Sequence, residues 1–345
     1  MADKKFNIGI IGAGMIGDVH LENILRDGRG EVTWIATRTE KTLNKKLQKY
    51  NIANGTTDYR ELLQDDDLDA VIIAAPPFVH LAMFEAALKA GKHIVIEKPL
   101  AANRADMEQM VKIAAQYPDL MILECSCRHA RLQPKFDFVK KIIDSGKIGE
   151  VYHIHHNAVS RGTFIEWNPA GTWAHQHEKA GGGAFVDWGV YDLSFHLGLL
   201  NDKAELQSLE SFTKNGLKPL PENLESDIEE HGAAYMKFDT GLTYYFERGA
   251  GVQFEVPNET RIYGTKGGLR FGFCSWDPAE VELFYVDDAG NEKQETLKVD
   301  VPDSHDDNFA FTEHFLDCLD GKAKPGMSIQ RAAKHLDIIF KILGK

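Results

Sequence analysis

Cysteine is scarce in this chain of 345 residues, which also lacks long apolar runs and any excess of basic charge. The four cysteines form no pair of Cys-x-x-Cys motifs, so neither a zinc site of that type nor a disulfide framework is indicated, and we expect reduced, buried thiols. No segment approaches the roughly 18 consecutive apolar residues of a membrane-spanning helix. The sequence therefore predicts a protein without a membrane span.

The net charge and the N-terminal residues bear on the possible partners and on the cellular location. Lys and Arg total 39 and Asp and Glu total 52, and the resulting formal net charge of −13 disfavours a nucleic acid as partner, because an acidic protein repels a phosphate backbone. Residues 1–5 run directly into an apolar segment, without the longer apolar region and small-residue cleavage site of a secretory signal. We therefore expect a cytoplasmic protein.

Short apolar runs alternate with helical segments through the first third of the chain, a rhythm that is typical of a parallel sheet with crossover helices. Strands are expected at 6–11, 32–36, 71–75, 93–96 and 120–123. Helices are expected at 15–26, 78–90 and 103–117. The pattern predicts a doubly wound α/β domain over residues 1–123.

Longer β-like segments dominate the rest of the chain, at 150–160, 233–238, 242–248 and 254–263. Helices are expected at 134–144, 187–200 and 328–343. An antiparallel sheet needs helices on one face only, so the other face can stay open or pair with a second subunit. We predict an α+β domain over residues 124–345 with an open-faced, mainly antiparallel sheet, a C-terminal helix that packs back on the first domain, and a homodimer or homotetramer formed through the sheet.

A Gly-x-Gly-x-x-Gly string, formed by Gly12, Gly14 and Gly17, lies between an expected strand and an expected helix. In that context Gly12 makes a tight turn, Gly14 lets a pyrophosphate approach the backbone, and Gly17 allows close helix packing. The N–H groups at the start of the helix, around Met15 and Ile16, would bind the anion. An ordinary strand-to-helix turn is the alternative, but the context favours a dinucleotide site in a Rossmann domain.

The residues after the second expected strand bear on the choice of cofactor. An acidic residue about 20 positions beyond the glycine string would bind the ribose 2′-hydroxyl and favour NAD(H). The chain has Thr37 and Arg38 at this place. Because Arg38 can pair with a 2′-phosphate, NADP(H) is favoured. NAD(H) or dual use stays open, since Arg38 can also be a solvated loop residue.

Two groups of residues suggest the chemistry. Lys98 follows an apolar strand at the edge where a doubly wound sheet has its ligand crevice, so its ammonium could hold a substrate hydroxyl as that group loses its proton. Asp187 and Tyr191 follow a glycine-rich turn and, four apart on one expected helix, share a face. Tyr191 could relay the hydroxyl proton, and Asp187 could accept a hydrogen bond. Taken singly, a surface lysine, a helix cap and a packing tyrosine are the ordinary interpretations.

Five motifs in both expected domains carry a family resemblance: the glycine string at 12–17, Ala75-Pro76-Pro77-Phe78-Val79-His80, Ala90-Gly91-Lys92-His93, Glu97-Lys98-Pro99-Leu100 and the segment 181–192. Together they resemble the glucose-fructose oxidoreductase, inositol dehydrogenase and MocA (Gfo/Idh/MocA) family. The resemblance implies a Rossmann domain followed by an open-faced sheet domain. It also implies that Lys98 lies on the cofactor side and that Asp187 and Tyr191 meet it.

The same resemblance implies cofactor contacts from Ala75, Pro77, His80 and Glu97. Many members of the family have histidine where this chain has Tyr191, whereas tyrosine is similar to glucose-fructose oxidoreductase and to the dihydrodiol and xylose dehydrogenases. With tyrosine, we expect the Lys98 ammonium to stabilise the ionised phenol and Asp187 to orient rather than titrate. The lack of an export signal favours a freely exchanging cofactor.

Five histidines raise the question of a metal site: His153, His155, His156, His175 and His177. Alternate strand positions place His153 and His155 on one face, but without converging ligands the five indicate hydrogen bonding or packing, and we predict no metal. Arg128, Arg161, Trp173 and His175 are candidates for substrate contacts. A tryptophan can stack on the apolar face of a sugar ring or pack in the core.

The sequence therefore predicts an NAD(P)-dependent oxidoreductase that transfers a hydride between the nicotinamide and a carbinol carbon of a sugar, polyol or sugar derivative. One alternative is a glycosidase-like enzyme that oxidises a sugar transiently and returns the hydride to it. Another is a non-catalytic NADP-binding sensor. The sensor hypothesis predicts the loss of Lys98, Asp187 or Tyr191, and all three are present.

Overall fold

The computed structural model describes residues 5–163, 166, 171–222 and 224–345, and the chain divides into two compact units. The first consists of Met1–Arg128 and Asp306–Ala333, and the second of His129–His305 and Lys334–Lys345. The segment Asp306–Ala333, which the sequence analysis placed with the second domain, thus groups with the first. The functional division at residues 123 and 124 stays a prediction.

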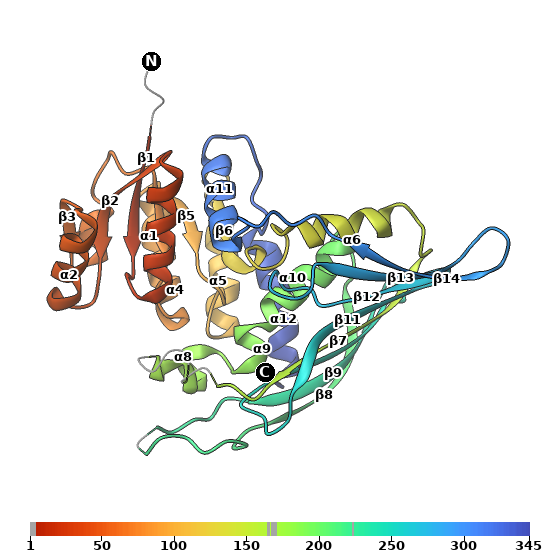
Figure 1. Ribbon diagram of the computed structural model, residues 1–345. Helices are drawn as coiled ribbons and strands as arrows, with labels where there is room; N and C mark the ends of the chain where they lie inside the picture. Colours follow the sequence, from red (N-terminus) through yellow and green to blue (C-terminus); the bar gives the residue numbers. More distant parts are fainter. Residues whose placement is uncertain (1–4, 164–165, 167–170, 223) are drawn as a thin grey trace. The chain divides into compact units, whose positions relative to one another are not determined.

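The first unit contains a six-stranded parallel sheet with the strand order β3-β2-β1-β4-β5-β6 (Figure 1). Its strands are β1 (Phe6–Ile11), β2 (Gly30–Ala36), β3 (Asn54–Thr56), β4 (Ala70–Ile73), β5 (His93–Ile96) and β6 (Ile122–Glu124). The order reverses between β1 and β4, which is the place where Rossmann folds bind dinucleotides. The predicted Rossmann domain is confirmed, with β6 two residues later than expected at its start.

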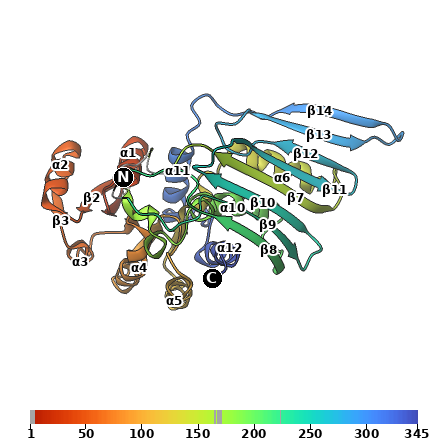
Figure 2. The ribbon, with the colours of Figure 1, turned by 90° about the horizontal axis from the view of Figure 1, so that it is seen from below.

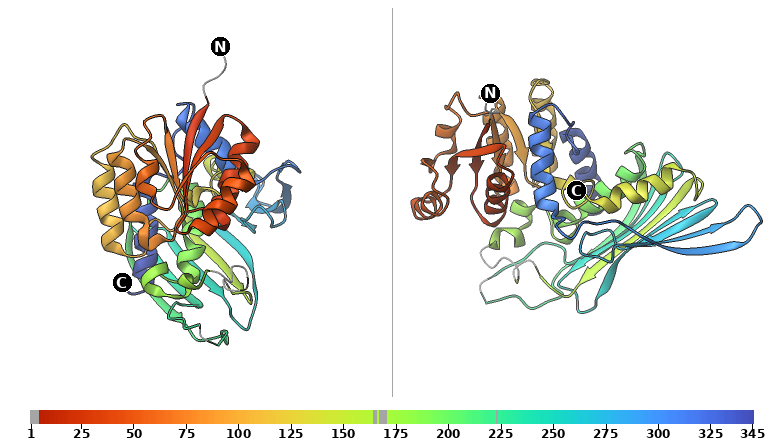
Figure 3. Two further views of the ribbon diagram at one scale, coloured as in Figure 1. Left: turned by 90° about the vertical axis from the view of Figure 1, so that its left-hand side faces the viewer. Right: turned by 45° about the horizontal axis from the view of Figure 1, so that its top comes forward.

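Helices lie on both sides of this sheet, as the left panel of Figure 3 shows. They are α1 (Met15–Asp27), α2 (Glu40–Tyr50), α3 (Tyr59–Leu62), α4 (His80–Lys89), α5 (Arg104–Ala114) and α11 (Asp307–Leu319), with short 3-10 helices η1 (Pro77–Val79) and η2 (Cys125–Cys127). Local signals set several ends: Thr39 and Asn103 cap the starts of α2 and α5, and left-handed Gly28 ends α1.

Helix α11 joins the first unit from the far end of the sequence. It packs against α1, where the Arg26 guanidinium lies 3.7 Å from the centre of the Phe309 ring and His20 meets the Phe311 ring edge-on. This helix was not among those expected from the sequence. Its apolar residues, among them Phe311 and Phe315, therefore belong to the core of the first unit.

The second unit contains an eight-stranded sheet with the order β14-β13-β12-β11-β7-β10-β9-β8 (Figure 2). Its strands are β7 (Val151–Ser160), β8 (Leu206–Lys214), β9 (His231–Phe238), β10 (Thr243–Ala250), β11 (Val256–Gly264), β12 (Gly267–Phe271), β13 (Glu280–Val286) and β14 (Glu292–Lys298). Neighbouring strands are antiparallel except β7 and β10, which are parallel. The predicted mainly antiparallel sheet is confirmed.

The two faces of this sheet differ. Helices α6 (Pro134–Asp144) and α10 (Gly189–Leu199) lie on one face of the sheet (Figures 1 and 2). Phe136 and Phe195 pack there in a core with Ile262 of β11. Alternate residues point the other way, and among them Tyr235 is 43% and Tyr263 37% exposed. One face is therefore core and the other is accessible, as the period of two in a strand requires.

The expected helix at 187–200 is wrong in one respect, because the structure divides it. Helix α9 (Ala184–Asp187) ends at Trp188, whose φ of −112° and ψ of −28° interrupt the helix before α10 begins at Gly189. A Cβ at Gly189 would lie 3.3 Å from the Phe246 ring, so glycine permits a close approach there. Asp187 and Tyr191 consequently belong to two successive helices.

Two further expectations concern the chain as a whole. All four cysteines are free and buried, as predicted. Among the described residues, no helix combines the length and the apolar character needed to cross a bilayer. The last helix, α12 (Ile329–Ile342), is shared between the units at residues 333 and 334, and its predicted packing on the first domain stays a prediction.

Candidate functional site

The glycine loop between β1 and α1 has the geometry that a pyrophosphate requires. Gly12 has a φ of +96°, and a Cβ there would lie 2.6 Å from the Ala74 carbonyl oxygen. A Cβ at Gly17 would lie 2.1 Å from the Gly12 carbonyl oxygen, whereas one at Gly14 would meet nothing within 4 Å. Gly12 and Gly17 are thus needed by the fold itself, while Gly14 borders open space.

The start of α1 supplies donors to that space. Gly14 is the N-cap residue without a side-chain cap, and the first bond within the helix runs from the Asp18 N–H to the Gly14 carbonyl. The N–H groups of the first turn, including those of Met15 and Ile16, have no acceptor within the helix. With the partial positive charge of a helix start, they fit the diphosphate of a nicotinamide dinucleotide.

The loop after β2 holds the two residues that bear on cofactor choice. The Thr37 N–H donates to the Thr56 carbonyl at 3.1 Å and its hydroxyl to the Thr39 carbonyl at 3.1 Å, so this turn is fixed from inside. Arg38 follows with an exposed side chain. An exposed guanidinium on a fixed turn is able to contact a 2′-phosphate.

Ala75, Pro77 and His80 lie in the segment that follows β4, and His80 joins it to a second loop. The His80 ring nitrogens lie 2.8 Å from the Ala75 carbonyl oxygen and 3.1 Å from that of Leu100, beyond β5. Burial lowers the pKa of His80, whose side chain has no exposed surface. His80 therefore links the loops after β4 and β5, and its predicted contact with the cofactor stays a prediction.

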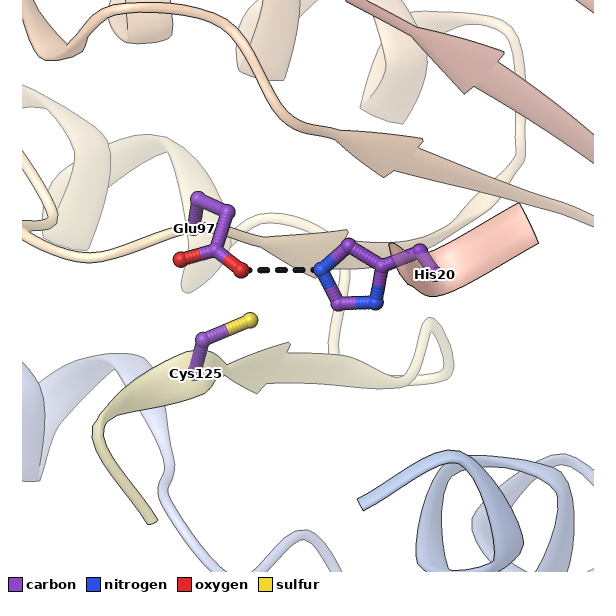
Figure 4. Close-up of side chains that lie close together, drawn as sticks. All are labelled: His20, Glu97 and Cys125. Atoms are coloured by element: carbon purple, nitrogen blue, oxygen red, sulfur yellow. Dashed lines mark hydrogen bonds and ion pairs between the residues drawn. The ribbon is translucent and has the colours of Figure 1, made fainter. Parts of the chain in front are cut away.

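Lys98 stands directly beyond β5, after a buried carboxylate that is held from two sides. Glu97 accepts from His20 Nε2 at 2.8 Å (Figure 4). It also accepts from Arg128 Nη1 at 2.5 Å. Burial alone would raise the pKa of Glu97, but Arg128 and His20 hold it well below its usual range. Its Oε2 also accepts from the Lys98 N–H at 3.2 Å. The ionised Glu97 thus fixes the backbone that carries Lys98.

The same place is where a metal would be sought. His20, Glu97 and Cys125 offer ligand atoms within 4.8 Å of one another, and they are the one such group among the described residues (Figure 4). The Arg128 guanidinium, however, already occupies the Glu97 oxygen that His20 shares, and burial raises the pKa of the Cys125 thiol well above its usual value. The buried Arg128 guanidinium and the protonated Cys125 thiol disfavour a metal ion at this place. Glu97, His20 and Arg128 instead form a network of charged and hydrogen-bonded groups.

Arg128, a predicted substrate contact, pairs with Glu97, and its contact with a substrate stays a prediction. It is buried, its Nη2 lies 3.4 Å from Glu97 Oε2, and its guanidinium lies 5.9 Å from the Phe311 ring centre. The other candidates lie in the second unit. Arg161 is exposed, Trp173 is half-buried, and His175 is buried with its Nε2 unpaired among the described residues.

The glycine-rich turn before Asp187 is held by a residue that the sequence analysis did not identify. The Glu229 carboxylate accepts from the N–H of Gly183 at 2.7 Å and of Phe185 at 3.1 Å, at the start of α9. A Cβ at Gly183 would lie 1.9 Å from the Glu229 carbonyl oxygen. Glycine is required at position 183 because the Glu229 backbone lies against it.

A buried ion pair between Arg248 and Asp192 lies next to the segment that carries Asp187 and Tyr191. Arg248 of β10 donates to both carboxylate oxygens of Asp192, each at 2.7 Å, and lies 5.6 Å from the Trp188 ring centre. Burial opposes both charges, yet Arg248 holds the pKa of Asp192 well below its usual range, and Asp192 raises the pKa of Arg248, with smaller contributions from Cys274 and Asp187. Arg248 is thus linked to both helices of the motif.

A hydrogen-bonded chain of core residues lies beside this ion pair. One set of tautomers satisfies it: Tyr244 donates to His196 Nδ1 at 2.7 Å, His196 Nε2 donates to Thr260 at 2.9 Å, and Thr260 donates to His156 Nδ1 at 3.0 Å. His156 Nε2 then lies 3.2 Å from Asp192. His156 is therefore a core residue, as the packing interpretation of the histidines anticipated.

Aromatic rings surround Tyr191. The Tyr191 ring lies 5.1 Å from that of His129 and 5.2 Å from that of Trp188, and both of these contact Trp276. Tyr191 itself is 1% exposed. The predicted proton-transfer residue thus stands in an aromatic environment that local sequence did not reveal, because His129 and Trp276 are distant from it along the chain.

Two family models match the chain, over residues 6–124 and 136–270. The first describes an oxidoreductase family with an NAD-binding Rossmann fold, and the second a GFO/IDH/MocA C-terminal domain. The chain belongs to the GFO/IDH/MocA oxidoreductase family. The resemblance noted in the sequence is confirmed, and the protein is an oxidoreductase with the Rossmann fold that binds a nicotinamide dinucleotide.

Known members of the family align with most of the chain. It is 25% identical over 264 residues to an uncharacterized oxidoreductase, YrbE, of Bacillus subtilis, covering 76% of this chain and 73% of that one. It is 23% identical over 262 residues to myo-inositol 2-dehydrogenase of Thermotoga maritima, with coverages of 76% and 74%. A solved levoglucosan dehydrogenase, in complex with NADH and levoglucosan, has the same fold, with a TM-score of 0.85 at 19% identity over 99% and 97% of the two chains.

The contrast between Gly14 and Gly17 leads to a first prediction. Gly14→Ala should leave the melting temperature nearly unchanged, because its φ of −77° suits alanine and the methyl group meets no protein atom. The methyl group should weaken NAD(P)H binding by about 10-fold or more, because it enters the space of the pyrophosphate. Gly17→Ala is the comparison, and it should destabilise the protein. Unchanged NAD(P)H titrations with Gly14→Ala would show that no pyrophosphate lies there.

Glu124 provides a second prediction. Burial raises its pKa to about 7 from 4.5, although Ser126 donates to it twice. Since the folded protein disfavours the charged form, stability falls as pH rises from about 4.5 to 7 and then levels off. Glu124→Gln should remove that loss, worth roughly 2–3 kcal/mol, in urea unfolding at pH 5 to 8. Exposed Glu31→Gln serves as control, and parallel pH profiles for Glu124→Gln and wild type would contradict the prediction.

Proposed function

We propose that this oxidoreductase transfers a hydride between a nicotinamide cofactor and a carbinol carbon of a sugar, polyol or sugar derivative. The observation that carries the proposal is the position of Lys98, held by the backbone that Glu97 fixes at the carboxyl edge of the Rossmann sheet. Ligands of open α/β sheets bind outside this edge, near the switch between β1 and β4. A cation at that edge suits an oxygen that develops negative charge.

In the proposed reaction, Lys98, Asp187 and Tyr191 act on one substrate hydroxyl. The glycine loop at Gly12, Gly14 and Gly17 would hold the nicotinamide dinucleotide, which would supply the acceptor for the hydride of the carbinol carbon. Tyr191 takes the hydroxyl proton, and the Lys98 ammonium stabilises both the phenolate and the substrate oxygen as the carbonyl forms. Asp187 accepts a hydrogen bond from a neighbouring hydroxyl and orients the substrate. In the reverse direction Tyr191 returns the proton to the carbonyl oxygen.

The substrate class is supported by relatives and by donors in the second unit. One relative is named for myo-inositol and one structural neighbour for levoglucosan, both of which carry several hydroxyls. His175 Nε2 is buried and unpaired among the described residues, so a substrate hydroxyl would satisfy it. Arg161 and Trp173 remain candidates for further contacts, while the ion pair of Arg128 with Glu97 favours a positioning role for that residue.

The cofactor and the setting complete the proposal. We propose NADP(H) as the preferred cofactor, because Arg38 is exposed beyond β2, with NAD(H) as the alternative. We also propose a homodimer or homotetramer that buries the accessible sheet face, where Tyr235, Tyr263 and His153 lie close together. A cytoplasmic location is proposed as well, and four free cysteines are consistent with a reducing compartment.

Lys98→Ala tests the function. Wild type should change the absorbance of NADPH or NADH when offered a panel of inositols, aldoses, anhydrosugars and their keto forms, and the variant should lose about 100-fold or more in kcat. Lys89→Ala, an exposed lysine of α4, is the matched control. Cofactor binding without turnover in wild type would favour the non-catalytic sensor. Substrate conversion without a net change in NAD(P)H would favour the glycosidase-like enzyme that returns the hydride to the sugar.

Arg38→Ala tests the cofactor preference. Loss of the guanidinium should raise the Kd for NADPH by about 10-fold or more, because a charge-assisted pair with the 2′-phosphate disappears. The Kd for NADH should stay within about 2-fold of wild type. Fluorescence titration with both cofactors measures this, with exposed Lys41→Ala as control. Equal effects on the two cofactors would remove the case for NADP(H).

A further inference from the structure

Trp276 is a large apolar side chain that the second unit holds in an exposed position. It is 62% exposed and lies between β12 and β13. Its loop is fixed from inside, where buried Lys135 donates to the carbonyls of Gly272 at 2.7 Å and Cys274 at 3.1 Å. Asp277 accepts from the Cys274 N–H at 2.9 Å. These bonds fix the backbone of the loop that carries the indole, as a preformed binding surface requires.

A single exposed tryptophan needs no explanation, but Trp276 is the outer end of a cluster of rings. It meets Trp188 edge-on at 5.4 Å and His129 at 5.8 Å. His129 and Trp188 are stacked on each other, with 29° between their planes, and each contacts Tyr191. One layer of rings therefore connects the exposed indole with the buried Tyr191, and Trp188 follows Asp187 directly in the chain.

The chemistry of this surface selects for shape. A cyclic polyol or pyranose presents a flat patch of C–H groups, and these complement the electron-rich face of an indole while the hydroxyls at the ring edge stay free for polar partners. An open-chain polyol has no such face. An aromatic surface next to Asp187 and Tyr191 therefore favours a substrate whose reacting carbinol belongs to a ring.

We propose that Trp276, supported by Trp188 and His129, is a specificity-determining residue on which the ring of a cyclic sugar or polyol stacks during the reaction. This inference rests on the proposed function and names its substrate class. Trp276 contacts the substrate, whereas Trp188 and His129 position the indole.

Steady-state kinetics of Trp276→Ala and Trp276→Phe test the proposal, with myo-inositol, levoglucosan and glucose as cyclic substrates and sorbitol and xylitol as open-chain ones. Trp276→Ala should raise KM for the cyclic substrates that wild type turns over by about 5- to 10-fold and change kcat by less than about 2-fold. Trp276→Phe should keep KM within about 3-fold of wild type. Phe254→Ala, an aromatic side chain 69% exposed elsewhere in this unit, is the control.

A binding measurement makes the result independent of the alanine variant's folding. In the presence of NADPH or NADH, a cyclic substrate should quench the tryptophan fluorescence of wild type, and Trp276→Phe should lose most of that quenching. Equal KM increases for cyclic and open-chain substrates, or unchanged quenching in Trp276→Phe, would overturn the inference while leaving the oxidoreductase intact. Absence of turnover by wild type with every compound would remove the proposed function and this inference with it.

Discussion

The buried carboxylate of Glu97 is the point on which the dinucleotide-binding unit depends. An ionised carboxylate removed from water is costly unless charges and donors surround it, and here His20 and Arg128 do so. His20 belongs to the helix that begins at the glycine loop, and Arg128 follows the last strand of the sheet. A single charge therefore ties together the cofactor loop, the backbone of Lys98 and the exit of the chain from the sheet.

The second unit repeats this device with different residues. Asp192 is held by Arg248, and the pair lies under the break between α9 and α10. Replacing such a pair by apolar residues would often keep or improve stability, so its value lies in placing neighbouring groups. In both units a fixed internal charge supports a side chain proposed to take part in the reaction: Lys98 in one, Asp187 and Tyr191 in the other.

Sequence reasoning succeeded where the signal was local. The glycine string, its strand and its helix follow one another within about 20 residues, and α6 has the expected bounds because Pro134 starts it and an apolar stripe runs to its end. Local patterns could not identify Glu229, Arg248 and Trp276. Each is distant along the chain from the 181–192 segment and contacts it only in the folded structure. Strand β14 was missed because it is polar and mostly exposed, and β13, its hairpin partner, was missed although Val281 and Leu283 lie in the core. Helix α11 was missed because its partner α1 lies almost 300 residues earlier.

The discontinuous first unit has a consequence for the order of folding during synthesis. Helix α11 leaves the ribosome only after all strands of the eight-stranded sheet have been made. One side of α1 in the nascent first unit therefore stays without its partner α11 while the second unit is synthesised. Domains that are synthesised first commonly fold first. In this chain the earliest residues reach their final packing among the last.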